Sequence, residues 1–395
     1  MQRLPTLDEV VVTSKRVLLR ADLNVPLADG GVADDYRIRA TLPTINRLRA
    51  DGAITIVCSH LGRPKGPDPR LRMNPVAHSL SELAGFPVRK LDRVVGPEVE
   101  AEVMKATAGE VLLLENTRFE PGETVNDSAL SQALARLGEL FVLDAFGSAH
   151  RAHSSTVGVA SHLRSAAGPL LLAEVEAFER LLTNPPRPFV VLLGGAKVSG
   201  KLGLVRNLLP NVDAMLIGGG MCFTLLAAEG YDVGASLLEH EMIASSRQIL
   251  DSAHGIRMNL PIDLVVGEEF VENTAAQVAP VERMPAGGVA LDIGPETIER
   301  FVAAVSGSGS VYWNGPMGVF EWEAFRAGTK AVAEAIGAHD GFSVVGGGDT
   351  VAALRMFGVD ERVSHMSTGG GAGLELLEGR TLPGIEALEK WADGQ

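Results

Sequence analysis

Residues Val191-Leu-Leu-Gly-Gly-Ala-Lys-Val-Ser-Gly-Lys-Leu202 join an apolar run to a turn rich in glycine and lysine, and then to helix-forming sequence. This order predicts a buried strand that passes through a glycine turn into a helix. Backbone N–H groups at such a turn and a nearby ammonium can both bind an anion, and glycine lets the backbone approach it closely. The segment therefore predicts a phosphate-binding loop.

The same residues also match most of a P-loop. Residues 195–201 have the GxxxxGK spacing, but Leu202 stands where a P-loop has the Ser or Thr whose hydroxyl binds magnesium. A P-loop NTPase therefore stays an alternative on this segment alone. A dinucleotide-dependent dehydrogenase is disfavoured because no GxGxxG follows an apolar run.

Length and charge narrow the class of protein. A chain of 395 residues is expected to form two domains, at roughly 100–200 residues per domain. Hydrophobic residues at 46% and charged residues at 21% are typical of a globular protein. The formal charge of −14 argues against a general nucleic-acid binder, so basic residues are expected only in a local anion site.

Cysteine usage and the apolar runs predict the compartment. Cys58 and Cys222 lie in or beside apolar stretches, so we expect two reduced, buried thiols. The N-terminus lacks an apolar signal core, and no apolar run reaches the ~20 residues that span a bilayer. These features predict a cytoplasmic protein without a membrane partner.

Short apolar runs rich in β-branched residues recur along the chain and predict buried strands. They occupy residues 17–19, 54–57, 111–114, 141–143, 189–193, 214–217, 264–266, 289–293, 311–313 and 342–345. Amphipathic stretches of helical length, such as 40–50, 127–137 and 324–336, lie between them. The alternation predicts an α/β fold with two doubly wound, Rossmann-like parallel sheets.

A connecting helix is expected between the two domains. Residues 170–182 form an uninterrupted helical stretch that Thr183-Asn-Pro-Pro-Arg-Pro188 ends. We expect an N-terminal domain over 1–168, a hinge helix and linker over 169–188, and a C-terminal domain over 189–379. The C-terminal segment 380–395 is expected to pack back on the first domain.

The residues that follow the strands differ between the two halves. In open α/β sheets ligands bind beyond the carboxyl ends of the strands. In the first half these ends carry Arg20-Ala-Asp-Leu-Asn24, Ser59-His-Leu-Gly-Arg63, Glu115-Asn-Thr-Arg118 and Asp144-Ala-Phe-Gly-Ser-Ala-His-Arg151. In the second half they carry Gly194-Gly195, Gly218-Gly-Gly220, Asn314-Gly-Pro-Met-Gly318 and Gly346-Gly-Gly-Asp-Thr350. Arginine clusters suit a small, multiply charged anion, whereas glycine loops suit a nucleotide.

Taken together, these segments resemble the phosphoglycerate kinase family from about Lys15 to Pro383. The matching motifs are Val17-Leu-Leu-Arg-Ala-Asp-Leu-Asn-Val-Pro26, Tyr36-Arg-Ile-Arg39, His60-Leu-Gly-Arg-Pro64, Leu114-Glu-Asn-Thr-Arg-Phe119, 144–153, Leu193-Gly-Gly-Ala-Lys-Val-Ser199, Tyr312-Trp-Asn-Gly-Pro-Met-Gly-Val-Phe-Glu321, 346–350 and Ser367-Thr-Gly-Gly-Gly371. The resemblance implies a glycolytic enzyme that transfers a phosphoryl group reversibly between 1,3-bisphosphoglycerate and MgADP, giving 3-phosphoglycerate and MgATP. We expect a monomer.

The resemblance also implies the site residues. Arg37, Lys197 and Lys201 would be catalytic. The glycerate substrate would be held by Asp22, Leu23, Asn24, Arg37, His60, Leu61, Gly62, Arg63, Arg118 and Arg151. The nucleotide would be held by Gly195, Lys197, Lys201, Asn314, Glu321, Gly347, Gly348, Asp349 and Thr350. Asp349 would be the Mg²⁺ ligand, since Mg²⁺ usually takes one or two carboxylates beside phosphate oxygens and water.

Residue chemistry supports a kinase over a non-catalytic nucleotide-binding protein, the other alternative. The acceptor of the reverse reaction is a carboxylate, already ionised at neutral pH, so the site needs cations and no general base. Arg37 and Lys197 are both retained. His150 and His153, which flank Arg151, stay outside the predicted set, and residues 239–241 are expected to be solvated acidic surface.

Two positions depart from the family pattern. Gly200 stands where the family usually has Asp, and Gly373 where it often has Ser. Both are expected near the path of the phosphates, where they would affect nucleotide affinity and rate.

Overall fold

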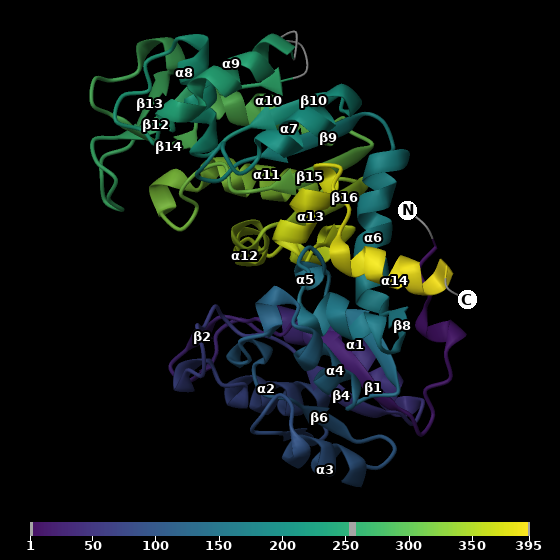
Figure 1. The fold of residues 1–395 in the computed structure, drawn as a ribbon. Coiled ribbons are helices and arrows are strands. Elements are labelled where there is room, and N and C mark those ends of the chain that lie inside the picture. The colour runs from purple at the N-terminus through teal and green to yellow at the C-terminus, as the bar shows by residue number, and fades with distance from the viewer. Residues whose placement is uncertain (1–2, 253–257, 394–395) are drawn as a thin grey trace. The chain divides into compact units, whose positions relative to one another are not determined.

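The computed structural model describes residues 3–252 and 258–393, which group into two compact units. Unit 1 runs to Glu176 and resumes at Thr381, and unit 2 runs from Ala177 to Arg380. The division falls inside helix α6 (Pro169–Thr183), so its first half belongs to unit 1 and its second half to unit 2 (Figure 1).

Unit 1 is built on a six-stranded parallel sheet. In sheet order the strands are β5 (Val88–Lys90), β6 (Val111–Leu113), β4 (Ile54–Cys58), β1 (Arg16–Ala21), β7 (Leu140–Asp144) and β8 (Arg164–Ala167). The helices are α1 (Tyr36–Ala50), α2 (Asn74–Ala84), α3 (Pro97–Lys105), α4 (Ser128–Ala135) and α5 (Phe146–Ala149), and β2 (Leu27–Ala28) pairs with β3 (Gly31–Val32) in a hairpin. Buried β1, β4 and β7 residues such as Leu19, Val57 and Val142 form the core.

The last helix, α14 (Pro383–Asp393), belongs to unit 1 (Figure 1). A Cβ added at Gly384 would lie 3.1 Å from Cα of Ala149 in α5, so α14 packs closely there. The Arg164 guanidinium of β8 also lies 5.5 Å from the ring centroid of Trp391. Helix α14 therefore packs on the body of unit 1, far from it in the sequence.

Unit 2 has a second six-stranded parallel sheet. In sheet order the strands are β11 (Met258–Asn259), β10 (Ala214–Ile217), β9 (Phe189–Leu193), β15 (Ser310–Asn314), β16 (Phe342–Gly346) and β17 (His365–Met366). The helices are α7 (Leu202–Leu208), α8 (Met221–Glu229), α9 (Ile243–Ser252), α10 (Pro295–Ser306), α11 (Ala327–Gly337), α12 (Gly348–Met356) and α13 (Gly370–Leu377). Residues such as Leu192, Trp313 and Val345 are fully buried in its core.

Two predicted strands lie outside the parallel sheets. The runs 264–266 and 289–293 form β12 (Asp263–Gly267) and β14 (Val289–Ile293), which pair antiparallel in a separate sheet with β13 (Gln277–Pro280). Figure 1 shows these three strands grouped at one side of unit 2. The prediction that these two runs join a parallel sheet is wrong, because β13 lies between them in the chain and the connections from β12 to β13 and from β13 to β14 are shorter than the dozen or so residues that a parallel crossover needs.

The predicted thiols are as expected. Cys58 and Cys222 are both unpaired and buried, and burial raises the pKa of Cys58 to about 12. Among the described residues, no helix combines the length and the apolar content of a membrane-spanning segment.

Candidate active site

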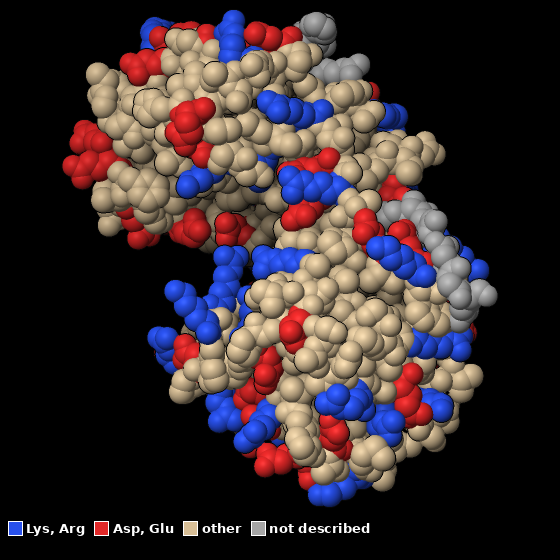
Figure 2. Space-filling model, in the orientation of Figure 1, with Lys and Arg blue, Asp and Glu red and all other residues tan. Residues whose placement is uncertain are grey.

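The predicted substrate residues of unit 1 follow four neighbouring strands. β6, β4, β1 and β7 are adjacent and parallel, so the segments after them emerge at one edge of the sheet. Those segments carry His60, Arg63, Arg118 and Arg151. In Figure 2 several Lys and Arg side chains gather at one edge of unit 1. The sheet topology thus collects basic residues that are far apart in the sequence.

Arg37 is held by the segment that follows β1. It lies in the first turn of α1, and its Nη1 donates to Oδ1 of Asp22 at 3.2 Å and to the carbonyl oxygen of Asn24 at 2.9 Å. The Asp22 carboxylate is buried, and it also accepts from the backbone N–H of Asn24 at 3.2 Å. These contacts orient the guanidinium.

The loop after β4 is locked to its neighbours. The N–H of Gly62 donates to Oδ1 of Asn24 at 2.7 Å, and the N–H of Leu61 donates to Oδ1 of Asn116 at 3.1 Å. Arg118 Nη1 donates to the Gly62 carbonyl oxygen. Leu23, like Leu61, is buried, so both contribute backbone and packing. Hydrogen bonds therefore join Asn24, the loop at Leu61 and Gly62, and Arg118 into one network.

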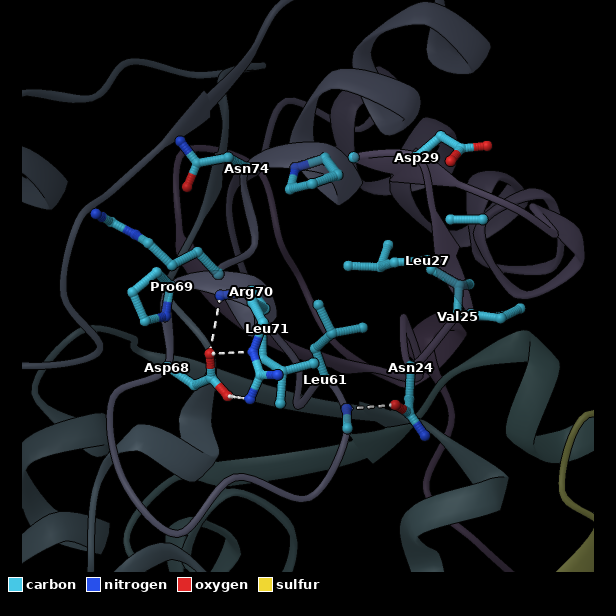
Figure 3. Close-up of a pocket in the computed structure, with 16 residues that line it drawn as sticks. Asn24, Val25, Leu27, Asp29, Leu61, Asp68, Pro69, Arg70, Leu71 and Asn74 are labelled. Carbon is cyan, nitrogen blue, oxygen red and sulfur yellow. Dashed lines mark hydrogen bonds and ion pairs between the residues drawn. The ribbon is translucent and has the colours of Figure 1, made fainter.

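A cavity of ≈ 1010 Å³ lies beside this network (Figure 3). Its lining includes Asn24, Leu61 and Gly62 of this network and Leu27 and Asp29 of the hairpin. Figure 3 shows the bond between Asn24 and Gly62 at its wall. Three of the predicted substrate residues therefore border this cavity, whereas Arg37, His60, Arg63, Arg118 and Arg151 are not part of its lining.

Arg20 is a buried functional candidate that does not belong to the predicted set. Its side chain is fully buried, where Nε donates to Oγ of Ser155 at 2.9 Å and Nη2 lies 3.0 Å from Nδ1 of His60. Ser155 in turn donates from Oγ to the buried Glu123 carboxylate at 2.5 Å. An arginine inside the apolar run Val17–Ala21 was the available signal, because a charged residue is rarely buried without partners.

Burial and neighbouring positive charges lower the pKa values of two side chains in this cluster, His60 and Arg118. Burial lowers the pKa of His60 well below its ordinary value, and Arg20, Arg118 and Arg37 reinforce the shift. Burial, followed by the charges of Arg151 and Arg20, lowers the pKa of Arg118 to about 10. Such a cluster favours a bound anion, which relieves the repulsion.

Two further residues of this region have different surroundings. Arg63 is exposed, and its charge acts on Arg118. Arg151 donates from Nε to Nε2 of His150 at 2.9 Å. His153, which is not in the predicted set, is buried, and burial and then Arg20, Arg118 and Arg151 lower its pKa to about 4.

In unit 2 the predicted nucleotide residues follow β9, β15 and β16, which are adjacent. Lys201 Nζ donates to the carbonyl oxygens of Gly194 at 2.7 Å and Asn314 at 2.8 Å. Burial lowers the pKa of Lys201 to about 7, and Asp349 partly opposes the shift. An ammonium held by carbonyls at a strand end can bind a phosphate through its third N–H.

Asn314 and Thr350 form the wall next to Lys201. Oγ1 of Thr350 accepts from the N–H of Gly315 at 2.7 Å. Nδ2 of Asn314 is buried and has no hydrogen-bond partner among the described residues, and a Cβ added at Gly347 would lie 3.2 Å from it. Gly347 also has φ 94°, which favours glycine. A buried, unpartnered donor favours a ligand at this place.

The glycines after β9 allow close backbone packing. A Cβ added at Gly194 would lie 2.1 Å from the carbonyl oxygen of Pro316, and Gly195 has φ 88°. The 218–220 glycines serve the same loop, because a Cβ at Gly219 would lie 2.6 Å from the backbone nitrogen of Gly195. The tight turn predicted from the sequence therefore packs against a second glycine turn.

The outer residues of the predicted nucleotide set are exposed. They are Lys197, Glu321, Gly348 and Asp349, and Asp349 lies in the first turn of α12. No group of three or more metal-ligating side chains occurs in residues 3–252 and 258–393. One accessible carboxylate is nevertheless a donor set that fits Mg²⁺, which takes its other ligands from phosphates and water.

The acidic segment 239–241 is not simply solvated surface, as the sequence suggested. Glu239 Oε2 accepts from the N–H of Val198 at 2.7 Å and of Ser199 at 3.0 Å, and Oε1 accepts from Ser199 Oγ at 2.6 Å. The sequence held no signal for these contacts, because the partners are about forty residues apart in the chain.

Gly200 and Gly373 have different surroundings. No atom lies within 4 Å of a Cβ added at Gly200, which is exposed. A Cβ at Gly373 would lie 2.5 Å from Cζ of Phe178 in α6. Gly370, three residues earlier, is the α13 residue whose added Cβ would meet Gly347, at 3.2 Å. The Gly373 departure therefore concerns packing between α13 and α6.

Comparison with known proteins identifies the family. The family model described as phosphoglycerate kinase matches residues 7–380. The phosphoglycerate kinase of Moorella thermoacetica is 52% identical over 386 residues, which cover 97% of this chain and 98% of the relative. The phosphoglycerate kinase of Rubrobacter xylanophilus is 52% identical over 381 residues, which cover 96% of this chain and 97% of the relative.

A solved structure supports the same fold, with its two parallel sheets. The structure of phosphoglycerate kinase from Coxiella burnetii aligns with a TM-score of 0.87 at 39% identity, over 98% of this chain and 99% of that chain. The P-loop NTPase alternative is wrong. The chain has phosphoglycerate kinase activity in glycolysis, and it belongs to the phosphoglycerate kinase family.

Proposed function

We propose that unit 1 binds 3-phosphoglycerate or 1,3-bisphosphoglycerate and that unit 2 binds MgADP or MgATP. The observation that carries this assignment is the arginine cluster around His60 in unit 1, where burial and like charges lower the pKa of Arg118 to about 10. A small substrate with a phosphate and a carboxylate would neutralise that cluster through forked hydrogen bonds. The partly buried Lys201 side chain and the buried Nδ2 of Asn314 are donors of unit 2 that suit the phosphates of a nucleotide.

We assign the chemical roles from charge. A carboxylate acceptor needs no general base, so catalysis depends on positioning and on stabilising the charge of the moving phosphoryl group. Arg37 acts on that charge from the first unit and Lys197 from the second, with Lys201 on the nucleotide phosphates. Asp22 and the Asn24 carbonyl orient Arg37.

Asp349 is the proposed ligand of Mg²⁺. Its exposed carboxylate at the start of α12 can reach a metal that also contacts nucleotide phosphates. When bound, the metal neutralises charge on the phosphates. Glu321, which is exposed after β15, would accept from the ribose hydroxyls.

We further propose that residues 169–188 act as the connection between the domains and that the enzyme is a cytoplasmic monomer. The domain limits 1–168 and 189–379 belong to this proposal. The α6 helix supports it, since it spans the division between the two compact units.

A binding experiment with one variant in each unit tests the assignment. Arg118→Met is expected to weaken 3-phosphoglycerate binding and leave MgADP binding unchanged, and Lys201→Met is expected to do the reverse. Calorimetric titration of each ligand measures both. Arg136→Met, at an exposed arginine of unit 1, is the matched control. Loss of nucleotide binding in Arg118→Met would overturn the assignment of the glycerate substrate to unit 1 and of the nucleotide to unit 2.

A further inference from the structure

The loop that carries Lys197 is held in two different ways. Its first residues are fixed by backbone bonds: the N–H of Gly194 donates to the Asn314 carbonyl oxygen at 3.0 Å, and the Gly195 N–H to that of Pro316 at 2.9 Å. The N–H of Met221 also donates to the Gly195 carbonyl oxygen at 2.9 Å. These bonds end before Lys197.

The part of the loop after Lys197 is held by one side chain from elsewhere in the chain. Glu239 accepts from the N–H groups of Val198 and Ser199 and from the Ser199 hydroxyl, at 2.7, 3.0 and 2.6 Å. A local bond also closes this turn, from the Lys201 N–H to the Val198 carbonyl oxygen at 2.9 Å. Glu239 thus fixes the residue that directly follows Lys197.

Glu239 is itself anchored to the body of unit 2. Its N–H donates to Oγ1 of Thr224 in α8 at 3.2 Å, and its carbonyl oxygen accepts from Met242 at 2.9 Å. Burial raises the pKa of Glu239, but the hydrogen bonds from Ser199 and Val198 and the charge of Lys197 outweigh burial and lower it. The carboxylate is therefore ionised, and charge-assisted bonds of this kind are about twice as strong as neutral ones.

The clamp also decides which groups of the loop remain open to a ligand. The N–H groups of Val198 and Ser199 are occupied by Glu239, so they are not open donors for phosphate. Helix α7 begins only at Leu202. The side chains of Lys197 and Lys201 are the cationic donors of this loop, and their placement depends on the loop backbone.

We propose that Glu239 is a positioning residue for phosphoryl transfer: its carboxylate clamps the backbone after Lys197 and so places the lysine ammonium. This inference rests on the catalytic role proposed above for Lys197. Glu239 is assigned a role through the loop backbone and not through contact with substrate. It acts because a shift of about 1 Å in a catalytic group can lower a rate by about 10²-fold.

A double-mutant cycle tests the proposal. Glu239→Ala is expected to lower kcat by about 10²-fold with little change in the KM for 3-phosphoglycerate, because only the placement of Lys197 is lost. In a Lys197→Met background the same substitution is expected to have no further effect. Glu241→Ala removes an exposed carboxylate two residues away and is expected to leave kcat unchanged. An equal loss in both backgrounds would overturn the proposal.

A measurement without turnover separates the clamp from the catalytic role. Amide hydrogen exchange at Val198 and Ser199 is expected to accelerate in Glu239→Ala but not in Glu241→Ala. Unchanged exchange would show that the clamp does not hold the loop. If Lys197→Met keeps full activity, the role of Lys197 and with it that of Glu239 are overturned, even where exchange accelerates.

Should Glu239→Ala fail to fold, Ser199→Ala offers a milder version. It removes one of the three bonds and keeps the carboxylate. A smaller fall in kcat that again disappears in the Lys197→Met background would support the proposal, and a fall that persists there would overturn it.

Discussion

Nη2 of Arg20 lies 3.0 Å from Nδ1 of His60 in the buried floor of the unit 1 cluster. Arginine nitrogens only donate hydrogen bonds, so Nδ1 accepts and the proton of the neutral ring resides on Nε2. The pair thereby determines which ring nitrogen of His60 can donate to a substrate.

His60 is expected to be neutral at neutral pH, with its proton on Nε2, because burial and neighbouring arginines lower its pKa well below the ordinary value. Nitrogen chemical shifts of the His60 ring measure both properties. Arg20→Met is expected to remove the contact that fixes the tautomer of the His60 ring, and to raise the pKa of His60. A ring that carries its proton on Nδ1 in the unmodified protein would contradict the prediction.

Arg37→Met is expected to keep the fold and MgADP binding while lowering kcat by about 10³- to 10⁵-fold, the range for an arginine that stabilises phosphoryl-transfer charge. Asp22 and Asn24 hold the guanidinium in a defined geometry, so Arg37→Lys should recover little activity. Steady-state kinetics measure the change. A loss below about tenfold would remove Arg37 from the catalytic role.

We predict that the Lys201 side chain takes up a proton when nucleotide binds. Burial lowers the pKa of Lys201 to about 7 in the free protein, so at about pH 8 most of the lysine is neutral. A phosphate beside Nζ favours the charged form and raises the pKa, so MgADP binding should take up a proton. Calorimetry in buffers of different ionisation enthalpy counts that proton, and Lys201→Met should abolish the uptake. The same uptake in the variant would exclude Lys201 as its source.

Gly200→Asp is expected to fold normally, since no atom lies within 4 Å of the added Cβ. A less flexible residue before Lys201 should raise kcat modestly, whereas the new negative charge should weaken nucleotide binding at low salt. Kinetics across ionic strengths measure both effects. Tighter nucleotide binding with a lower kcat would contradict both expected effects, that of the less flexible residue on kcat and that of the new charge on nucleotide binding.

Gly373→Ser is expected to destabilise unit 2 by about 1–3 kcal/mol, the usual effect of overpacking, because the new Cβ would meet the ring of Phe178 at 2.5 Å. Phe178→Leu in the same chain should recover part of the loss. Gly66→Ser, where the added Cβ meets nothing within 4 Å, is the control. Denaturant unfolding measures all three. Equal stability of Gly373→Ser and the unmodified protein would refute the packing argument.

Much of the fold was readable from local pattern. Each predicted run forms a strand, and the helix expected over 170–182 lies within α6 (Pro169–Thr183). The short strands β5, β8, β11 and β17 were not predicted from the sequence. Arg164-Ser-Ala-Ala167, for example, has no β-branched residue, and it forms a strand because β7 lies beside it.

The family and the residues at the strand ends were also apparent before any coordinates, because apolar runs, glycine turns and motif spacing are local properties of the chain. The pairing of Arg20 with His60, the Glu239 clamp and the antiparallel sheet of β12, β13 and β14 depend on segments that only folding brings together. Burial likewise exists only in the folded chain, and burial is the largest cause of the shifts at His60, Arg118 and Lys201. Local sequence therefore specified the elements and their chemistry, whereas tertiary structure decided partners and ionisation, because both depend on distance in space and on exclusion of water.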